Sequence, residues 1–482
     1  MASGNFEQAI TELSAEAARH PESAKLSAML AFAEWRSGRL EDAVKRFRTA
    51  IRLDPNSFSA HYNLALLYLQ QKEPASALPH LERAAQLDPK NPDVQYNCAL
   101  VLIDAGRGNE ALRHLLVVKQ LEPQRPDVRF QIVRAKLQMN RLSEANAEAA
   151  SFVSDYPDAA GAVGQAFLEF GQPGQAVTYL QKAVQGHPED ENVRSVLAEA
   201  LISDKRSAEA LTIIGDPGSA FGHALKAQAL YDCGRLPDAL SESQTAAAIE
   251  PSNAQYLVVA GRLLQLNNDA GANEYFKRAI TADPKWSEPH YNLAVSFYLQ
   301  QNYPAAIARL DEAIRLNPRC ARCLFLRGLS YFNRGELPAA KPDLEGAVAL
   351  EPKNARFRTH LSVLLYRSGQ PAAAESGFRM AISLDPTYGL AHYELGKLLA
   401  RKQARLDEAA RELEAAHRLD PNLRQALYQL GIVYQRLGKQ AEATQTFDEF
   451  RKQEAGEEDE QALRNDLMPS QPQWPRLTPP PQ

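Results

Sequence analysis

The chain has 482 residues, of which 45% are hydrophobic and 23% are charged. Its formal net charge is −5 and its basic residues are dispersed among acidic ones, which argues against a nucleic-acid partner because such a partner requires a strongly basic face. No stretch approaches the roughly 18 consecutive apolar residues of a membrane-spanning helix, so we expect no membrane span.

One small residue returns along the chain with a long and regular period. Alanine recurs fourteen times, most often 34 residues apart. The positions are Ala9, Ala43, Ala77, Ala111, Ala145, Ala176, Ala210, Ala239, Ala272, Ala306, Ala340, Ala374, Ala409 and Ala443. In twelve of the fourteen copies a proline follows twelve residues later. A period of this length predicts a solenoid of stacked repeats.

The repeat starts partway through its unit. Residues 6–20 carry Ala9 and predict a helix, but the segment that precedes the alanine helix in later copies is missing. The first residues contain neither the basic region nor the apolar region of a secretion signal. We expect a cytoplasmic protein, with an exported or periplasmic location as the alternative if a native leader has been removed.

Residues 58–91 show the content of one complete unit. Apolar residues at helical spacing from Tyr62 to Tyr68, followed by a polar stretch, predict a first helix and a turn. A second helix follows from Ala77 to Leu87 and ends at Pro89, because proline has no N–H and disfavours the helical conformation in the residue before it. We expect the recurrent alanine to lie where the two helices cross closely.

These residues resemble the signature of the tetratricopeptide repeat (TPR) family. Two copies read Tyr62-Asn63-Leu64-Ala65, Tyr68, Ala77, Leu81, Ala84, Pro89 and Tyr291-Asn292-Leu293-Ala294, Phe297, Ala306, Leu310, Ala313, Pro318. The resemblance covers about residues 5 to 455. It implies an all-α, right-handed superhelical solenoid of about 13 helix-turn-helix repeats plus an N-terminal half repeat. It also implies that the first helices line a concave groove that holds a peptide or protein.

The array is irregular near its middle. The alanine spacing falls to 31 residues before Ala176 and to 29 before Ala239, and residues 214–218 contain a Gly-Asp-Pro-Gly sequence that interrupts a helix. We therefore divide the solenoid into an N-terminal block with its half-repeat cap, residues 1–218, and a C-terminal block, residues 219–455. A hinge between the blocks and a shortened helix that packs continuously both remain open.

The repeat pattern ends after Ala455. Residues 456–482 begin with an acidic run and continue with six prolines around Trp474. This composition cannot bury a core and favours extended polyproline II, so we expect a disordered tail. Docking of its short proline motifs on a proline-recognising module is the alternative.

The resemblance locates inward-facing positions on the first helices, and these positions hold aromatic and amide side chains. Aromatic residues offer a large contact area with few rotatable bonds, and asparagine can bond both groups of a peptide backbone. The candidate partner-binding residues are Tyr62, Asn63, Tyr96, Asn97, Phe130, Tyr291, Asn292, Tyr298, Phe325, Phe332, Tyr366, Tyr393 and Tyr428. Ordinary packing of family-typical residues is the alternative at each position. The cluster of Tyr291, Tyr298, Phe325, Phe332 and Tyr366 is the best-supported site.

Two specialised activities of TPR arrays are not expected. Chaperone adaptors hold a C-terminal carboxylate with a set of five Lys, Asn and Arg residues, and at most two of the five match here. The corresponding positions hold Ala28, Phe32, Asp93 and Asn97 around Asn63, and Leu257, Gly261, Arg322 and Leu326 around Asn292. The array also resembles the asparagine-lined repeats that feed a sugar transferase, but its asparagines are intermittent and no catalytic domain follows.

No residue pattern indicates catalysis, a cofactor or a metal site. Cys320 and Cys323 are the one closely spaced cysteine pair, and a zinc site would need two more ligands nearby, so two ordinary thiols are favoured over a local disulfide. The histidines before the inward tyrosines, such as His61 and His392, are better explained by packing. The sequence has neither a phosphate-binding loop nor a catalytic signature.

The sequence therefore predicts a non-catalytic scaffold that binds peptide or protein partners along its groove. The alternative is a recruiting subunit, or a cell-envelope or secretion assembly factor, that works with an enzyme or apparatus encoded elsewhere. A native leader would favour the alternative, and capture of many unrelated soluble proteins would favour the scaffold.

Overall fold

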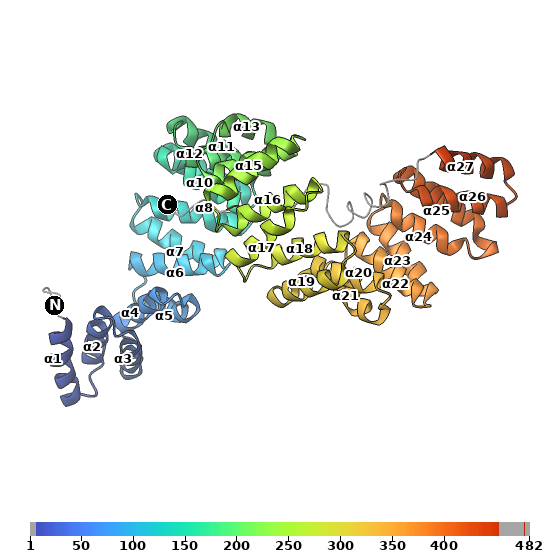
Figure 1. Ribbon diagram of the computed structural model, residues 1–482. Helices are drawn as coiled ribbons and strands as arrows, with labels where there is room; N and C mark the ends of the chain where they lie inside the picture. Colours follow the sequence, from blue (N-terminus) through green and yellow to red (C-terminus); the bar gives the residue numbers. More distant parts are fainter. Residues whose placement is uncertain (1–5, 453–476, 478–482) are drawn as a thin grey trace. The chain divides into compact units, whose positions relative to one another are not determined.

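The computed structural model describes residues 6–452 and Leu477. Within these residues it contains 27 α-helices, two short 3-10 helices and no strand, which confirms the predicted all-helical repeat fold (Figure 1). The chain divides into two compact units, Met1–Ile214 and Gly215–Gln482. The predicted hinge stays a prediction, and the predicted tail lies outside the described residues apart from Leu477.

The N-terminal unit contains thirteen α-helices, which alternate between first and second helices of the repeats. They are α1 (Phe6–Arg19), α2 (Ala24–Arg36), α3 (Leu40–Leu53), α4 (Phe58–Gln70), α5 (Pro74–Leu87), α6 (Pro92–Asp104), α7 (Gly108–Leu121), α8 (Pro126–Gln138), α9 (Leu142–Asp155), α10 (Ala160–Glu169), α11 (Pro173–Gly186), α12 (Glu191–Ser203) and α13 (Ser207–Ile214), with the 3-10 helix η1 (Pro157–Ala159) before α10. Helix α13 has only eight residues. Its early end agrees with the interruption that the sequence predicts at Gly215.

The C-terminal unit contains the remaining described helices. They are α14 (Ala220–Asp232), α15 (Leu236–Ile249), α16 (Ala254–Leu266), α17 (Ala272–Ala282), α18 (Ser287–Leu299), α19 (Tyr303–Leu316), α20 (Ala321–Asn333), α21 (Leu337–Leu350), α22 (Ala355–Arg367), α23 (Pro371–Leu384), α24 (Gly389–Leu399), α25 (Leu406–Leu419), α26 (Arg424–Arg436) and α27 (Gln440–Lys452), with η2 (Gln403–Arg405) before α25. Even-numbered helices are the first helices of the repeats, and each contacts the first helix of the next repeat from α14 to α24.

The recurrent alanines lie in buried contacts between the helices of the repeats. All of them except Ala9 are at most 2% exposed. In the repeat formed by α20 and α21, a Cβ added to Gly328 would lie 2.8 Å from Cγ of Leu344 and 3.3 Å from the carbonyl oxygen of Ala340. The crossing therefore leaves no room for larger side chains, because protein cores are packed as densely as organic crystals.

Replacement of Ala306 or Ala340 by leucine is expected to destabilise the array. Each change adds three carbons to a fully buried crossing, and overpacking of this kind costs about 1–3 kcal/mol. Thermal unfolding followed by circular dichroism measures the effect. The matched control is Ala308→Leu, because Ala308 lies on the same helix as Ala306 and is exposed. Equal melting temperatures for all three variants and the unmodified protein would contradict the close crossing.

The cysteine pair differs from the sequence-based expectation of two free thiols. Cys320 and Cys323 form a disulfide at the start of α20. Cys320 is the N-cap residue and Cys323 lies one turn further, so their Cα atoms are 5.2 Å apart, which is within the range that a disulfide spans. Cys98 and Cys233 are free.

Two histidines of one repeat face each other in the N-terminal unit. Nδ1 of His61 lies 3.1 Å from Nδ1 of His80, and Nε2 of His61 lies 3.2 Å from the carbonyl oxygen of Pro55. Burial lowers the pKa of both imidazoles from the usual value of 6.5. Two protonated rings at this distance would repel each other, so the pair favours the neutral form.

This pair is expected to make stability depend on pH. Because the pKa of each histidine is lower in the folded state, its contribution to the free energy of unfolding is present above the unfolded pKa of about 6.5 and is lost as the pH falls. Urea unfolding at about pH 7.5 and about pH 5.5 measures the loss. His80→Gln should reduce the difference between the two conditions, and an unchanged difference would assign the effect to other groups.

Candidate functional site

The candidate residues lie on the first helices of both units. Successive first helices contact one another from α6 to α8 and from α18 through α20 and α22 to α24, so their shared side forms a continuous face there. In the N-terminal unit the relevant helices are α4, α6 and α8, and in the C-terminal unit they are α18, α20, α22, α24 and α26. We call the part on α18 to α24 the C-terminal face, defined by Tyr291, Asn292, Tyr298, Phe325, Phe332, Tyr366 and Tyr393.

The candidate residues of the N-terminal unit are all half-buried. They are Tyr62, Asn63, Tyr96, Asn97 and Phe130. Nδ2 of Asn97 donates a hydrogen bond of 2.9 Å to the hydroxyl of Tyr62, across one repeat. The Arg125 guanidinium lies 4.4 Å from the ring centroid of Tyr96. Burial, with the nearby Asp127 carboxylate, raises the pKa of Tyr96 to about 12. These side chains thus bridge neighbouring repeats while remaining partly accessible.

The candidate residues of the C-terminal unit differ widely in exposure. Tyr291, Asn292, Tyr298, Phe325 and Tyr393 are each at most 8% exposed, Phe332 and Tyr366 are half-buried, and Tyr428 is 46% exposed. Tyr298 belongs to the hydrophobic core cluster of α18 to α22 and packs edge-on against Tyr303. Within the predicted partner-binding cluster, Phe332 and Tyr366 are therefore the aromatic residues that a partner can reach most directly.

An ion-pair network supports Tyr291 on the C-terminal face. The Arg322 guanidinium lies 4.5 Å from the ring centroid of Tyr291 and hydrogen-bonds to the Glu288 carboxylate. Nη1 of Arg262 lies 3.8 Å from the other oxygen of the same carboxylate. Burial lowers the pKa of Arg262 and raises the pKa of Tyr291. Two guanidinium groups share one carboxylate here, which leaves the network with an excess of positive charge.

Two further arginines cover the accessible aromatic residues. The Arg367 guanidinium lies 5.0 Å from the ring centroid of Phe332, and that of Arg401 lies 4.9 Å from Tyr366. In each pair the arginine comes 35 residues after the aromatic residue, from the next repeat. Nδ2 of Asn333 donates to the Tyr298 hydroxyl at 2.8 Å with the same offset. The first helices thus present a row of aromatic side chains, of which Tyr298, Phe332 and Tyr366 are each covered by a polar or cationic group.

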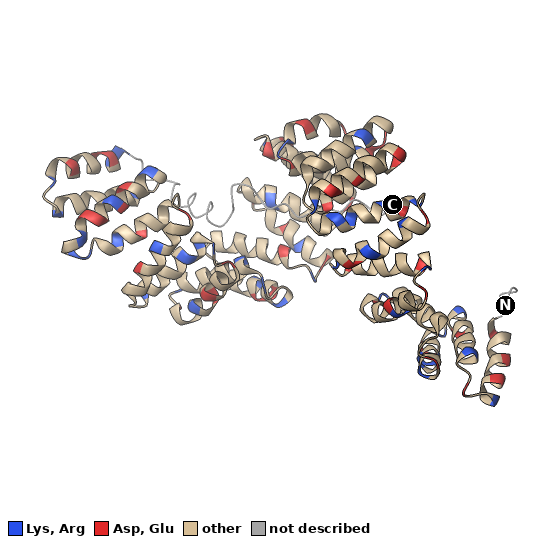
Figure 2. Ribbon diagram, turned by 180° about the vertical axis from the view of Figure 1, so that it is seen from behind, with Lys and Arg blue, Asp and Glu red and all other residues tan. Residues whose placement is uncertain are grey.

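A fourth cation covers the last tyrosine of the C-terminal face. Nζ of Lys397 lies 4.7 Å from the ring centroid of Tyr393 and donates to the Glu394 carboxylate at 2.6 Å. Sequence reasoning identified the aromatic positions but missed Arg262, Arg367, Lys397 and Arg401, and it considered Arg322 only as a mismatch to a carboxylate-binding set. The recurrence of the 35-residue offset is the sequence signal that could have found Arg367 and Arg401. Figure 2 shows Lys and Arg residues interspersed with acidic ones along the helices.

Asn292 does not offer its side chain to solvent. It is 3% exposed, and its Nδ2 has no hydrogen-bond partner among the described residues. Nε2 of Gln265 donates to the Asn292 carbonyl oxygen at 3.1 Å and to the Ser296 hydroxyl at 2.6 Å. The structure therefore places Asn292 in a buried polar cluster between α16 and α18. Contact of its amide with a partner backbone stays a prediction.

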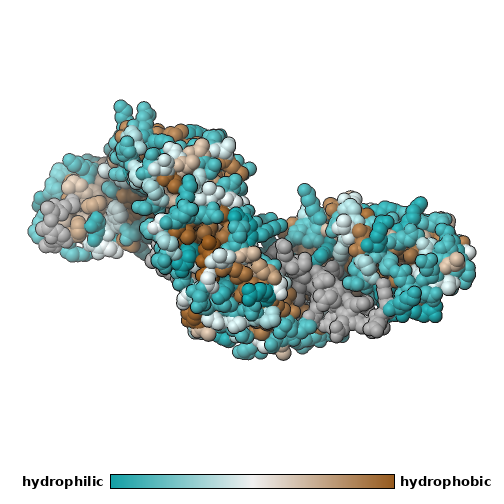
Figure 3. All heavy atoms as spheres, turned by 90° about the horizontal axis from the view of Figure 1, so that it is seen from above, coloured by the Kyte–Doolittle hydropathy of each residue, from teal (hydrophilic) through white to brown (hydrophobic). Residues whose placement is uncertain are grey.

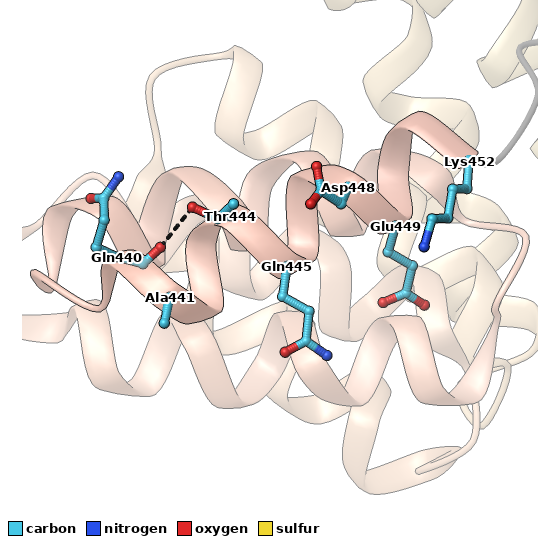
Figure 4. A pocket seen from close by; sticks show the side chains of 7 residues that line it. All are labelled: Gln440, Ala441, Thr444, Gln445, Asp448, Glu449 and Lys452. Carbon is cyan, nitrogen blue, oxygen red and sulfur yellow. Dashed lines mark hydrogen bonds between the residues drawn. The ribbon is translucent and has the colours of Figure 1, made fainter.

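Two surface depressions have linings that contain none of the candidate residues. One depression lies along α27 and is lined mainly by polar side chains, with the Thr444 hydroxyl donating to the Gln440 carbonyl oxygen at 2.9 Å (Figure 4). A more apolar one lies on α17 to α19 and is lined by Ile280, Leu293 and Phe297, with Lys277 and Arg309 beside them. Hydrophobic residues also appear in patches on the face seen in Figure 3.

The described part of the chain shows no assembled metal site or membrane helix. Among residues 6–452, no group of three or more His, Cys, Asp or Glu residues is arranged to hold a metal ion. None of the helices in the same range is long and apolar enough to cross a membrane. What the first-helix face offers chemically is aromatic surface, hydrogen-bonding groups and positive charge.

Comparisons with known proteins agree with the repeat pattern. Family models described as tetratricopeptide repeat match residues 1–43, 28–92, 68–120, 167–217, 291–340, 325–389 and 425–455. Together the matched residues make up more than half of the chain. A search of curated proteins gives no match.

Solved structures with similar folds include several repeat proteins. Yeast Tom70 is 17% identical over 92% of this chain and 94% of that chain, with a TM-score of 0.38. The Cut9 complex with Hcn1 is 15% identical over 91% and 95%, with a TM-score of 0.43. YrrB, described as a TPR protein with an unusual peptide-binding site, is 22% identical over 40% of this chain and 97% of its own, with a TM-score of 0.34.

Proposed function

Because the chain belongs to the tetratricopeptide repeat family, we propose that it is a non-catalytic scaffold that binds a peptide or protein partner on the first-helix side of the C-terminal unit. In this family the first helices line the concave side of the superhelix, where partners are held. The partner is a segment with apolar side chains for the aromatic row and acidic side chains for the cations above it.

The observation that carries this proposal is the row of cation-covered aromatic residues on the C-terminal face. Arg322, Arg367 and Arg401 each lie within 5.0 Å of an aromatic ring centroid, on three different repeats. Arg367 and Arg401 are exposed at the surface. Aromatic residues and arginine are the residue types that dominate binding energy at protein interfaces. The spacing of one repeat between successive pairs suits an extended segment that crosses several repeats.

The test compares partner capture by the intact chain with capture by a variant of the face. The full-length protein and the double variant Phe332→Ala/Tyr366→Ala are used to capture partners from lysate, and captured proteins are quantified by mass spectrometry. A partner that binds the C-terminal face is retained by the intact chain and lost from the variant. Equal capture of every partner by both proteins would place the binding surface elsewhere, for example on Tyr62, Asn63, Tyr96 and Asn97.

A further inference from the structure

The apolar depression on α17 to α19 lies outside the C-terminal face. It is lined by the large side chains of Ile280, Leu293 and Phe297 and by the small ones of Ala305 and Ala308. Leu293 is 3% exposed, Ile280 and Phe297 are half-buried, and Ala308 is exposed. Apolar surface that is bordered by polar groups is typical of interaction sites, because its contact with water is unfavourable.

Two cations border the depression. Lys277 is exposed and Arg309 is half-buried, and both contribute to the lining. Nζ of Lys277 lies 3.9 Å from the Glu274 carboxylate, an exposed pair of the kind that contributes little binding energy. The Arg309 side chain forms no ion pair or hydrogen bond with another residue in the range 6–452. The depression therefore combines apolar surface with positive charge that the described residues neutralise only weakly.

The next repeat shows how the same two flanking positions hold one group between them. The residues 34 positions after Lys277, Leu293 and Arg309 are Asp311, Arg327 and Asp343. Nη1 of Arg327 donates to the Asp311 carboxylate at 2.7 Å. Nε and Nη2 of Arg327 donate to the two carboxylate oxygens of Asp343, also at 2.7 Å. Side chains at the two flanking positions can thus converge on one group of opposite charge.

The depression has the reverse signs and lacks the central charged group. Lys277 and Arg309 flank Leu293, where the next repeat has Arg327. One carboxylate above Leu293 would complete an arrangement of the same kind with opposite charges. Two repeats after the depression, the three positions hold Glu345, Leu361 and Gly377. The paired cations are therefore not a general consequence of the repeat pattern.

We propose that this depression binds a partner protein through one acidic side chain, which lies between Lys277 and Arg309, and an adjacent apolar side chain, which packs on Leu293 and Phe297. Hydrogen bonds between cations and a carboxylate are stronger than those between neutral groups, and the apolar contact removes hydrophobic surface from water. The lining contains none of the residues that define the C-terminal face. The proposal therefore does not depend on the proposed function, and the scaffold can hold one partner on each surface.

The test selects a phage-displayed library of random peptides on the full-length protein. Peptides that also bind the full-length variant Lys277→Asp/Arg309→Asp are removed, which eliminates ligands of other surfaces, including the C-terminal face. We expect the remaining peptides to carry aspartate or glutamate next to a large apolar residue, because the cations and the apolar lining together recognise this pair. A remaining set without enrichment of acidic residues, or no remaining peptide, would overturn the proposal.

The affinities of one selected peptide, measured by fluorescence anisotropy, then locate the contact. Ala308→Leu should weaken binding about tenfold or more, because the larger side chain fills part of the depression. The control Arg319→Asp/Lys353→Asp reverses two exposed cations elsewhere in the unit and should leave binding unchanged. A peptide with lysine in place of its acidic residue should bind Lys277→Asp/Arg309→Asp and not the unmodified protein, since both charges are then reversed. Circular dichroism checks that all variants remain helical.

Three results of these titrations would contradict the proposal. They are unchanged binding to Ala308→Leu, an equal loss of binding in the control, and failure of the lysine peptide to bind the charge-reversed variant. Sedimentation velocity adds a fourth, since a dimer that dissociates in Lys277→Asp/Arg309→Asp would make a second copy of the chain the occupant. None of these variants changes Phe332 or Tyr366, so failure here leaves the proposed function intact, and failure of the capture experiment leaves this surface intact.

Discussion

Truncating Phe332 and Tyr366 together to alanine is expected to weaken binding of a captured partner by a hundredfold or more. Aromatic residues at the centre of an interface commonly cost about 2 kcal/mol or more when truncated, and each 1.4 kcal/mol corresponds to about tenfold in affinity. Phe332 also contacts Arg367, and Tyr366 contacts Arg401. The double variant therefore removes the rings against which these two arginines are oriented. Calorimetric titration of the purified partner into each protein measures the change.

The choice of these two residues follows from their exposure. Phe332 and Tyr366 are half-buried, whereas Tyr298 lies within the core cluster and its truncation would confound binding with stability. The control is Tyr275→Ala/Met380→Ala, which removes a half-buried and an exposed side chain from the second helices α17 and α23. Circular dichroism should show that both double variants remain helical. If the control weakens binding as much as the face variant does, the aromatic row is not the binding surface.

Replacing Phe276 by alanine is expected to destabilise the C-terminal unit by about 3–5 kcal/mol, the usual cost of removing a buried aromatic side chain. The Phe276 side chain is completely buried, in a cluster with Leu264 and Leu293. A Cβ added to Gly261 would lie 2.6 Å from Cε1 of Phe276, so the ring packs directly against the backbone of the first helix. Alanine would leave a cavity at this contact, since the helix backbone cannot move in to fill it.

Urea unfolding of the full-length protein, followed by circular dichroism, measures this loss. Phe276→Leu should cost less, because leucine fills the equivalent position in other repeats, as Leu310 and Leu344 show. Ile249→Ala serves as the control, since Ile249 is 47% exposed in the same unit. Unfolding midpoints that agree for Phe276→Ala and the control would show that the Gly261 contact carries little of the stability.

The candidate site was only partly predictable from sequence. The repeat register identifies which positions of a first helix are expected to face the groove, and the aromatic residues at those positions were named on that basis. Register does not give exposure, however, because Tyr298 and Tyr428 are both inward positions and are 3% and 46% exposed. The exposure of a side chain depends on how the neighbouring repeats pack against it, and the local pattern does not contain this information.

The contacts between repeats required coordinates. Arg401 stacks on Tyr366, and Arg322 and Arg262 share Glu288, because the stacking of neighbouring repeats brings these side chains together. The disulfide between Cys320 and Cys323 was likewise not predicted, because spacing alone permits both a bond and two thiols and we favoured the thiols. The burial of Leu477 had no sequence signal at all.

The fold of this protein follows from its local sequence pattern, whereas its candidate surface depends on how the repeats stack. A helical repeat is specified locally, because a small residue at each crossing, apolar residues at helical spacing and a proline at each helix end act within about 34 residues. The buried alanines, such as Ala306 and Ala340, follow this local rule. A binding surface is specified by side chains that different repeats bring together, as Phe332 and Arg367 do. Its charge, exposure and cover therefore emerge only once the repeats are stacked.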